Sequence, residues 1–181
     1  MLALLAIIFI ILTGISMLVF LSVIAVYNRL AGFRGAVKSS WSDINARHRE
    51  RYDLVSNLVE TIKGHAPQKK SLFESVCRAM SSARKASAPA DKAKAENMFN
   101  ETLKGLFAVT KEYPELKVDA NFRQLRARIE ELKDNIEEAR RNFNSVVRDY
   151  NTMIETFPSN IIASLLKFEK EEFFGLEEPR G

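Results

Sequence analysis

The sequence predicts an all-α protein in which an N-terminal transmembrane helix continues into an up-and-down antiparallel four-helix bundle. The first observation behind this prediction is a long, uncharged apolar run at the N-terminus. The second is that apolar residues recur at helical spacing through the rest of the chain, and no run alternates long enough to form a strand. None of the 27 basic and 23 acidic residues occurs before Arg29. One anchor and one helical domain therefore account for the 181 residues.

The apolar run covers residues 2–26 and reads LALLAIIFIILTGISMLVFLSVIAV. As a helix it would be ~37 Å long, more than the ~30 Å hydrocarbon core of a bilayer. The hydroxyls of Thr13, Ser16 and Ser22 can donate to the carbonyl one turn earlier, which makes them tolerable in lipid. A cleaved signal peptide is the alternative, but no basic residue precedes the run, and such peptides have only ~7–15 apolar residues. The sequence predicts an uncleaved anchor over residues 1–27.

Basic residues follow the span closely, and none precedes it. They are Arg29, Arg34, Lys38, Arg47, Arg49 and Arg51. The positive-inside rule therefore predicts an N-terminus outside the cell and a cytoplasmic domain after the span. The single cysteine, Cys77, excludes an internal disulfide and fits a reducing compartment.

Four amphipathic helices are predicted after the anchor, with the first continuous with the span. Their ranges are 28–64, 68–86, 91–111 and 119–156. Gly64 and Pro67 punctuate the end of the first helix, and a small, proline-bearing turn at 87–91 separates the second helix from the third. Short connections favour antiparallel neighbours, so the sequence predicts a bundle over residues 28–157.

The apolar stripes of these helices predict the core and the register. The first stripe includes Val37, Trp41, Ile44, His48, Tyr52 and Val55, and the third helix presents Ala95, Met98, Phe99, Leu103, Leu106 and Phe107. Antiparallel pairing of the first and fourth helices places Phe143 near Trp41 and Tyr150 near Gly35, where Gly32 and Gly35 would give the tyrosine ring room.

Residues 158–181 form a separate C-terminal segment, which begins after Phe157. Its apolar residues are Ile161, Ile162, Leu165, Leu166, Phe168, Phe173 and Phe174. We expect a short amphipathic helix that folds back over the seam between the first and fourth helices, or lies in the headgroup layer. The mixed charges of residues 169–172 favour the seam.

No pattern for catalysis, a cofactor or a metal is present in the sequence. His48 and His65 are far apart, Cys77 is single, and neither HExxH nor CxxC occurs. The sequence also has no glycine-rich phosphate loop and no GxSxG elbow. The basic stretch 47–51 is interrupted by Glu50 and lacks an aromatic platform, which favours a solvated face over nucleic-acid binding. The sequence thus predicts no catalytic, cofactor-binding or metal-binding residue.

Four asparagines lie beside predicted core positions, although asparagine is a poor helix former. They are Asn28, Asn57, Asn151 and Asn160. Buried amides are tolerated when they are hydrogen-bonded, so these residues predict a polar layer that sets the register between helices.

Three stretches resemble the LemA family of bacterial membrane proteins. They are VYNRLAGFRGAVKSSWSDINARHRERYDLVSNLVETIKGHA (26–66), YPELKVDANF (113–122) and FNSVVRDYNTMIETFPSNIIASLLKFEKEEFF (143–174). The residues we assign to the family signature are Tyr27, Asn28, Trp41, Arg51, Tyr52, Asp53, Asn57, Glu60, Arg148, Tyr150, Asn151, Glu155, Pro158 and Asn160.

The resemblance implies a four-helix bundle behind one span in the bacterial cytoplasmic membrane, with no established catalytic activity. It also implies an organising role, with membrane peptidases or TPM-domain proteins as partners. Three hypotheses follow: a membrane-tethered scaffold or adaptor, a membrane-organising or headgroup-sensing protein, and an enzyme of unknown type. The bilayer is a partner in each, and nucleic acid is not.

Overall fold

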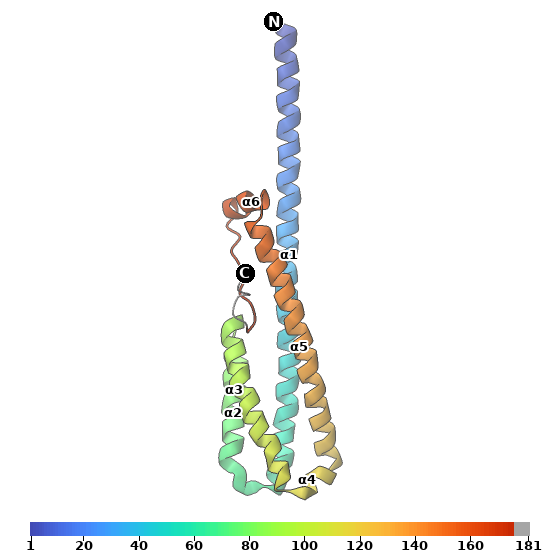
Figure 1. The fold of residues 1–181 in the computed structure, drawn as a ribbon, viewed down its shortest axis with the longest axis vertical. Helices are drawn as coiled ribbons and strands as arrows, with labels where there is room; N and C mark the ends of the chain where they lie inside the picture. Colours follow the sequence, from blue (N-terminus) through green and yellow to red (C-terminus); the bar gives the residue numbers. More distant parts are fainter. Residues whose placement is uncertain (176–181) are drawn as a thin grey trace. The chain divides into compact units, whose positions relative to one another are not determined.

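The computed structural model describes residues 1–175, apart from the side chains of Leu2 and Thr110. All regular structure in these residues is helical, which confirms the predicted fold class (Figure 1). The elements are α1 (Leu2–His65), η1 (Pro67–Lys69), α2 (Lys70–Lys85), α3 (Pro89–Ala108), η2 (Val109–Lys111), α4 (Pro114–Val118), α5 (Ala120–Glu155) and α6 (Ser159–Leu165).

The chain divides into two compact units, and both α1 and α5 contribute to each. We call residues 1–38 with 146–171 the span unit, because it contains the apolar run. Residues 39–145, with the chain from residue 172 onward, form the bundle unit.

In the span unit, the N-terminal part of α1 is a helix long and apolar enough to cross a membrane. The side chains of residues 3–25 are all exposed. Thr13 Oγ1 donates to the Phe9 carbonyl and Ser22 Oγ to the Leu18 carbonyl, each at 2.8 Å. These bonds satisfy the hydroxyls within the helix, as expected for a segment that has no water around it.

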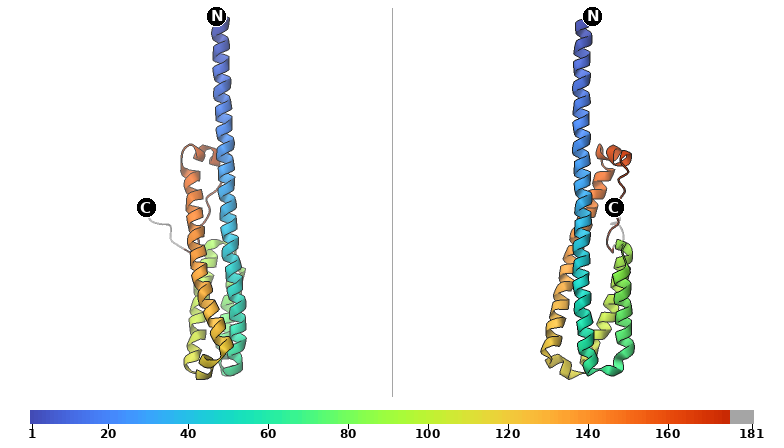
Figure 2. Two further views of the ribbon diagram at one scale, coloured as in Figure 1. Left: turned by 90° about the vertical axis from the view of Figure 1, so that its right-hand side faces the viewer. Right: turned by 180° about the vertical axis from the view of Figure 1, so that it is seen from behind.

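In the bundle unit, the second half of α1 packs with α2, α3 and the first half of α5, and α1 and α5 run antiparallel (Figure 2). The ring centroids of Trp41 and Phe143 are 5.4 Å apart, which confirms the predicted register. At the other end of the pair, Asn121 Nδ2 donates to Thr61 Oγ1 at 3.2 Å.

The core of the bundle unit is apolar and is built from every helix. Its buried members include Val55, Leu58, Ile62, Phe73, Val76, Phe99, Leu103, Leu106, Leu116, Phe122 and Ile129. Met98 was predicted to be part of this core, and that prediction is wrong, because its side chain is 65% exposed.

The helices of the bundle unit differ from the sequence prediction mainly at the start of α3 and in the additional helix α4. Helix α3 begins at Pro89, within the predicted turn, because proline suits the first helical position, where no N–H is needed. The short helix α4 was not predicted. It buries Leu116 completely, and the carboxylate of Asp119 then accepts the Phe122 N–H at 2.6 Å to start α5.

Tyr150 of the span unit is buried, and the charge of Arg34 acts on its hydroxyl. The tyrosine thus lies by the part of α1 that contains Gly35, as predicted. The predicted reason for the glycines is wrong, however. A Cβ atom at Gly32 or Gly35 would meet nothing within 4 Å, so neither glycine is needed to make room for the ring.

Two asparagines of α5 hold the C-terminal segment by its backbone. In the span unit, Asn151 donates to the Glu171 carbonyl and accepts the Glu171 N–H, both at 2.9 Å. In the bundle unit, Asn144 makes the same pair of bonds with Phe174, at 3.2 and 2.9 Å.

The predicted register-setting layer of four asparagines is therefore wrong. Asn28, Asn57 and Asn160 are exposed. Only Asn151 makes the kind of buried amide bonds that were expected, and it makes them with the tail rather than with another helix.

Candidate functional site

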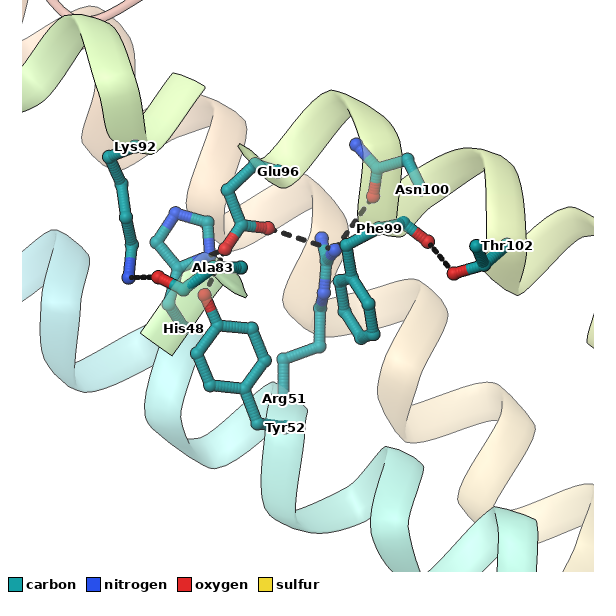
Figure 3. Close-up of polar contacts among 9 residues, drawn as sticks. All are labelled: His48, Arg51, Tyr52, Ala83, Lys92, Glu96, Phe99, Asn100 and Thr102. Atoms are coloured by element: carbon teal, nitrogen blue, oxygen red, sulfur yellow. Dashed lines mark hydrogen bonds and ion pairs between the residues drawn. The ribbon is translucent and has the colours of Figure 1, made fainter. Parts of the chain in front are cut away.

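A cluster of charged and polar side chains is buried in the bundle unit, where α1 faces α3 (Figure 3). Its members are His48, Arg51, Tyr52, Lys92 and Glu96, each no more than 5% exposed. Burying ionisable groups is costly unless they are paired, so a cluster of this kind is the strongest candidate for a functional site in the chain.

Glu96 is the hub of the cluster. Its carboxylate lies 3.2 Å from Arg51 Nη2 and 3.1 Å from His48 Nδ1, and it accepts a hydrogen bond from the Tyr52 hydroxyl. Three side chains from adjacent turns of α1 thus converge on one residue of α3. Removal of this carboxylate would leave the buried donor groups of His48, Arg51 and Tyr52 without their shared acceptor.

Two further bonds extend the cluster along α3. Lys92 Nζ donates to the Ala83 carbonyl near the end of α2, at 2.7 Å, and Arg51 Nη2 also donates to Asn100 Oδ1, at 2.7 Å. The guanidinium carbon of Arg51 lies 5.0 Å from the centre of the Phe99 ring. The cluster therefore ties α1, α2 and α3 together at one level of the bundle.

The environment shifts the pKa of each ionisable member. Burial lowers the pKa of His48, and the neighbouring Glu96 only partly offsets this effect. Burial also lowers the pKa of Lys92 and raises that of Tyr52. For Glu96, burial alone would raise the pKa, but the hydrogen bond and charge of His48 and the charge of Arg51 hold it below its ordinary value.

A small cavity of about 70 Å³ adjoins the cluster. His48, Arg51 and Glu96 line it, together with Phe174 of the C-terminal segment, whose ring centroid is 6.1 Å from that of His48. Within the described part of the chain, His48 Nε2 and Arg51 Nε have no hydrogen-bond partner. The cavity has room for one or two water molecules at ~30 Å³ each.

A larger groove lies on the surface between α3 and α5, with Arg51 at its base. Its volume is about 650 Å³. The apolar floor consists of Leu103, Phe107 and Ile129, and Met98 stands exposed at the edge. The rim carries both signs of charge, from Glu101, Lys104, Glu130 and Lys133.

The comparison with known families agrees with this architecture. The model of the LemA family matches residues 40–180. The chain belongs to the LemA family. No curated protein matches the sequence. The match begins after the apolar run, so the bundle unit and α6 carry the family resemblance.

The structure separates the residues that the sequence analysis assigned to the family signature into three groups. Arg51, Tyr52 and Tyr150 are buried, and the first two belong to the cluster. Trp41 and Asn151 are half-buried against aromatic rings and the tail, respectively. The exposed members are Tyr27, Asn28, Asp53, Asn57, Glu60, Arg148, Glu155, Pro158 and Asn160.

Several of the exposed signature residues form surface ion pairs. Asp53 pairs with Arg84 at 2.6 Å, Glu60 pairs with Lys63 at 2.6 Å, and Glu155 pairs with Lys170. Exposed pairs of this kind contribute little to stability, ~0–1 kcal/mol in general. Within residues 1–175, no group of three or more His, Cys, Asp or Glu side chains is arranged to hold a metal ion.

Sequence reasoning did not identify Glu96, Lys92 or Asn100 as part of the site. A signal was available for the first two. The buried residues of α3 include Phe99, Leu103 and Leu106, and stepping back from Phe99 in the same rhythm of three and four reaches Glu96 and Lys92. A charged residue on a core stripe is the sequence pattern of a buried ion pair.

Proposed function

We propose that this LemA protein is a membrane-anchored, non-enzymatic scaffold or adaptor. Residues 1–27 would be the anchor and residues 28–157 the bundle presented to protein partners. The proposed setting is a bacterial cytoplasmic membrane, with the N-terminus outside and the bundle in the cytoplasm, because the basic residues all follow the span.

The observation that carries the proposal is the groove between α3 and α5. Its apolar floor, mixed-charge rim and volume of about 650 Å³ suit one amphipathic helix of a protein partner. Met98 is the exposed apolar residue of this groove, and methionine adapts its shape to different partners. The buried cluster supports the groove from below, since Arg51 belongs to both.

The buried cluster itself supports a structural role better than a catalytic one. Its cavity of about 70 Å³ is far smaller than the ~300–1,000 Å³ of sites that bind small molecules. Its charged groups are directed at one another, so they fix how α1, α2 and α3 meet. The groove would then keep a constant shape for its partner.

Photo-crosslinking in intact membranes tests the proposal. A benzophenone amino acid at Met98 and another at Lys133 probe the two sides of the groove, and Val118, which is 75% exposed and not part of the groove, is the control. We expect the same protein adduct at positions 98 and 133 and none at 118. Adducts at 118 alone, or at none of the three, would overturn the groove as the partner site.

The proposed orientation has a separate test. Two reporters fused after Gly181 are compared, one that is active only in the cytoplasm and one that is active only outside it. We expect activity of the cytoplasmic reporter alone, since basic residues follow the span and none precedes it. A periplasmic signal would contradict the cytoplasmic bundle. The partners themselves, membrane peptidases or TPM-domain proteins, are suggested by family resemblance alone.

A second candidate function, membrane organisation or headgroup sensing, is favoured by the apolar side chains that α6 leaves exposed. In this case Arg29, Arg34 and Lys38 would favour anionic lipids. Association that weakens steeply with added salt would favour this candidate over the scaffold.

A further inference from the structure

Helix α6 buries small side chains and exposes large apolar ones. Ser159 and Ala163, four residues apart on one face, are buried, whereas Ile161 and Leu165 on the opposite face are 60% and 77% exposed. Phe157, in the turn just before α6, is also 75% exposed. A short helix in water normally buries its large apolar residues and exposes its small or polar ones.

After the apolar run, the exposed large apolar side chains of the described residues are concentrated in and beside α6. Among the described residues after Tyr27, the exposed large apolar side chains are Phe157, Ile161, Leu165, Leu166, Met98 and Val118. The first four lie within ten positions of one another. A contiguous apolar patch of this kind marks a contact with another molecule or with lipid.

The span unit places this patch at the end of the apolar run of α1. The Phe168 ring, directly after α6, packs edge-on against Tyr27 with centroids 6.2 Å apart. An open cleft of about 610 Å³ lies at the same level, lined on one side by Ala25, Val26 and Arg29 and on the other by residues around Phe157. Val26 is the last apolar residue of the span and Arg29 is its first charge.

The acidic residues that follow are held away from this level. Asn151 binds the Glu171 backbone through both its amide atoms, four residues before the end of α5. Four residues of helix correspond to about 6 Å. Lys170 pairs with Glu155, and Lys167, which is exposed, is the first charged residue after α6. The charges beside the patch are thus of both signs: Arg29 and Lys167 are basic, Asp149 lines the cleft, and Glu155 is paired with Lys170.

Backbone hydrogen bonds fix the conformation of the C-terminal end of α6. Lys167 adopts a left-handed conformation (φ 55°), its N–H donates to the Ser164 carbonyl at 3.3 Å, and the Phe168 N–H donates to the Ala163 carbonyl at 2.9 Å. This pair of bonds is a Schellman motif, which ends the helix and turns the chain back along α1. The exposed stripe is therefore a built feature of the fold.

We propose that α6 and Phe157 form a second membrane contact, in which the stripe Phe157–Ile161–Leu165 lies in the interfacial layer of the leaflet where the span ends. The occupant of the patch is lipid, because the patch continues the fully exposed apolar surface of the span at its boundary residue. Arg29 and Lys167 lie at the depth of the phosphates, where long basic side chains extend toward water. This inference rests on the membrane anchoring contained in the proposed function.

Lipid-borne quenchers test the proposal on the full chain in vesicles. In a Cys77→Ser background, single cysteines at Leu12, Leu165 and Val118 carry an environment-sensitive fluorophore, and the vesicles contain phosphatidylcholine with a doxyl group near the headgroup end of the acyl chain. Leu12 reports insertion of the span, and Val118, exposed in the bundle unit, is the aqueous control. We expect quenching at 165 at least fivefold greater than at 118.

The outcomes separate the two proposals. Quenching at 12 with none at 165 overturns the contact of α6 with lipid and leaves the anchor intact, and so does a crosslink between two copies at 165 that replaces quenching. No quenching at 12 overturns the anchor and, with it, the proposal for α6. As a matched variant, Leu165→Asp with the fluorophore at Ile161→Cys should reduce quenching to the level of 118, whereas Val118→Asp should leave it unchanged.

Discussion

The two units of this LemA protein differ in which side chains they bury and which they expose. In the bundle unit, leucines and phenylalanines are inside, and even charged groups such as Glu96 are buried, provided that they are paired. In the span unit, residues 3–25 and the stripe on α6 expose their large apolar side chains, while Ser159 and Ala163 are buried. The difference teaches that the exposure of a side chain has to be interpreted together with its solvent: burial of apolar and paired charged groups suits water, and we propose lipid around the apolar run and α6.

The largest expected effect is on the hub of the buried cluster. Glu96→Ala leaves Arg51 and Lys92 without their shared anion, and removing one partner of a buried ion pair typically costs ~3–5 kcal/mol. Urea unfolding of the full chain in detergent micelles measures the loss. Glu101→Ala is the matched control on the same helix, since its pair with Lys104 is exposed, and it should change the unfolding free energy little. Equal effects of the two changes would show that the cluster does not stabilise the bundle.

The next effect tests the aromatic contacts that hold the C-terminal segment in the bundle unit. The Trp41 ring lies 5.4 Å from that of Phe143 and 5.7 Å from that of Phe174. Because Trp41 is half-buried, Trp41→Ala should cost about 2–3 kcal/mol, at or below the lower end for a buried aromatic. Phe157→Ala in the span unit removes a ring of similar kind that is 75% exposed, and its melting temperature in micelles should stay close to that of the unmodified chain.

A smaller effect should appear in the dependence of stability on pH. Burial lowers the pKa of His48 below its ordinary value of 6.5, so the unfolded chain takes up this proton before the folded chain does. Stability should therefore fall as the pH drops through 6.5 toward the lower pKa of the folded state. Glu96 contributes at a lower pH, because its pKa lies below 4.5, and its stabilisation is lost only as the pH falls through that lower pKa.

His48→Gln removes this titration, because an amide does not take up a proton in this pH range. Between pH 6.5 and 4.5 the variant should lose less unfolding free energy than the unmodified chain, as measured by urea unfolding at several pH values. Parallel curves for the two chains would show that His48 takes up its proton equally well in both states. The prediction would then be wrong.

The sequence predicted the fold well where periodicity alone decides the structure. The apolar run, the continuous first helix and the pairing of Trp41 with Phe143 all follow from spacing, and each was found. The core stripe of α3 was predicted only in part, because the prediction counted apolar residues alone, and two of the buried positions, Glu96 and Lys92, are charged. A buried charge is stable only with partners from other helices, and sequence spacing cannot show which helices will supply them.

The C-terminal segment shows a second limit of prediction from sequence. Its apolar residues were expected to cover the seam between the first and fourth helices or to lie in the headgroup layer, with the seam favoured by the mixed charges of residues 169–172. Phe168 and Phe174 do pack on α1, but Ile161, Leu165 and Leu166 are exposed. A hydrophobic pattern indicates that a face avoids water, but it does not say whether protein or lipid covers that face. Only the three-dimensional position beside Val26 and Arg29 suggests lipid.

The last prediction makes the same change, leucine to alanine, once in each unit. The smallest effect on stability is expected for the change in the span unit, and the contrast with the bundle unit tests the comparison directly. Leu106→Ala in the bundle unit removes a completely buried side chain and should cost ~2–5 kcal/mol. Leu165→Ala in the span unit removes a side chain that is 77% exposed, so in micelles it should shift the unfolding free energy by less than ~0.5 kcal/mol. In vesicles, the same Leu165→Ala change should instead weaken lipid quenching of a fluorophore at Ile161→Cys, because the lost methyl groups no longer favour the interfacial layer. A large loss of stability in micelles would mean that Leu165 packs against protein, and the span unit would then follow the same rule as the bundle.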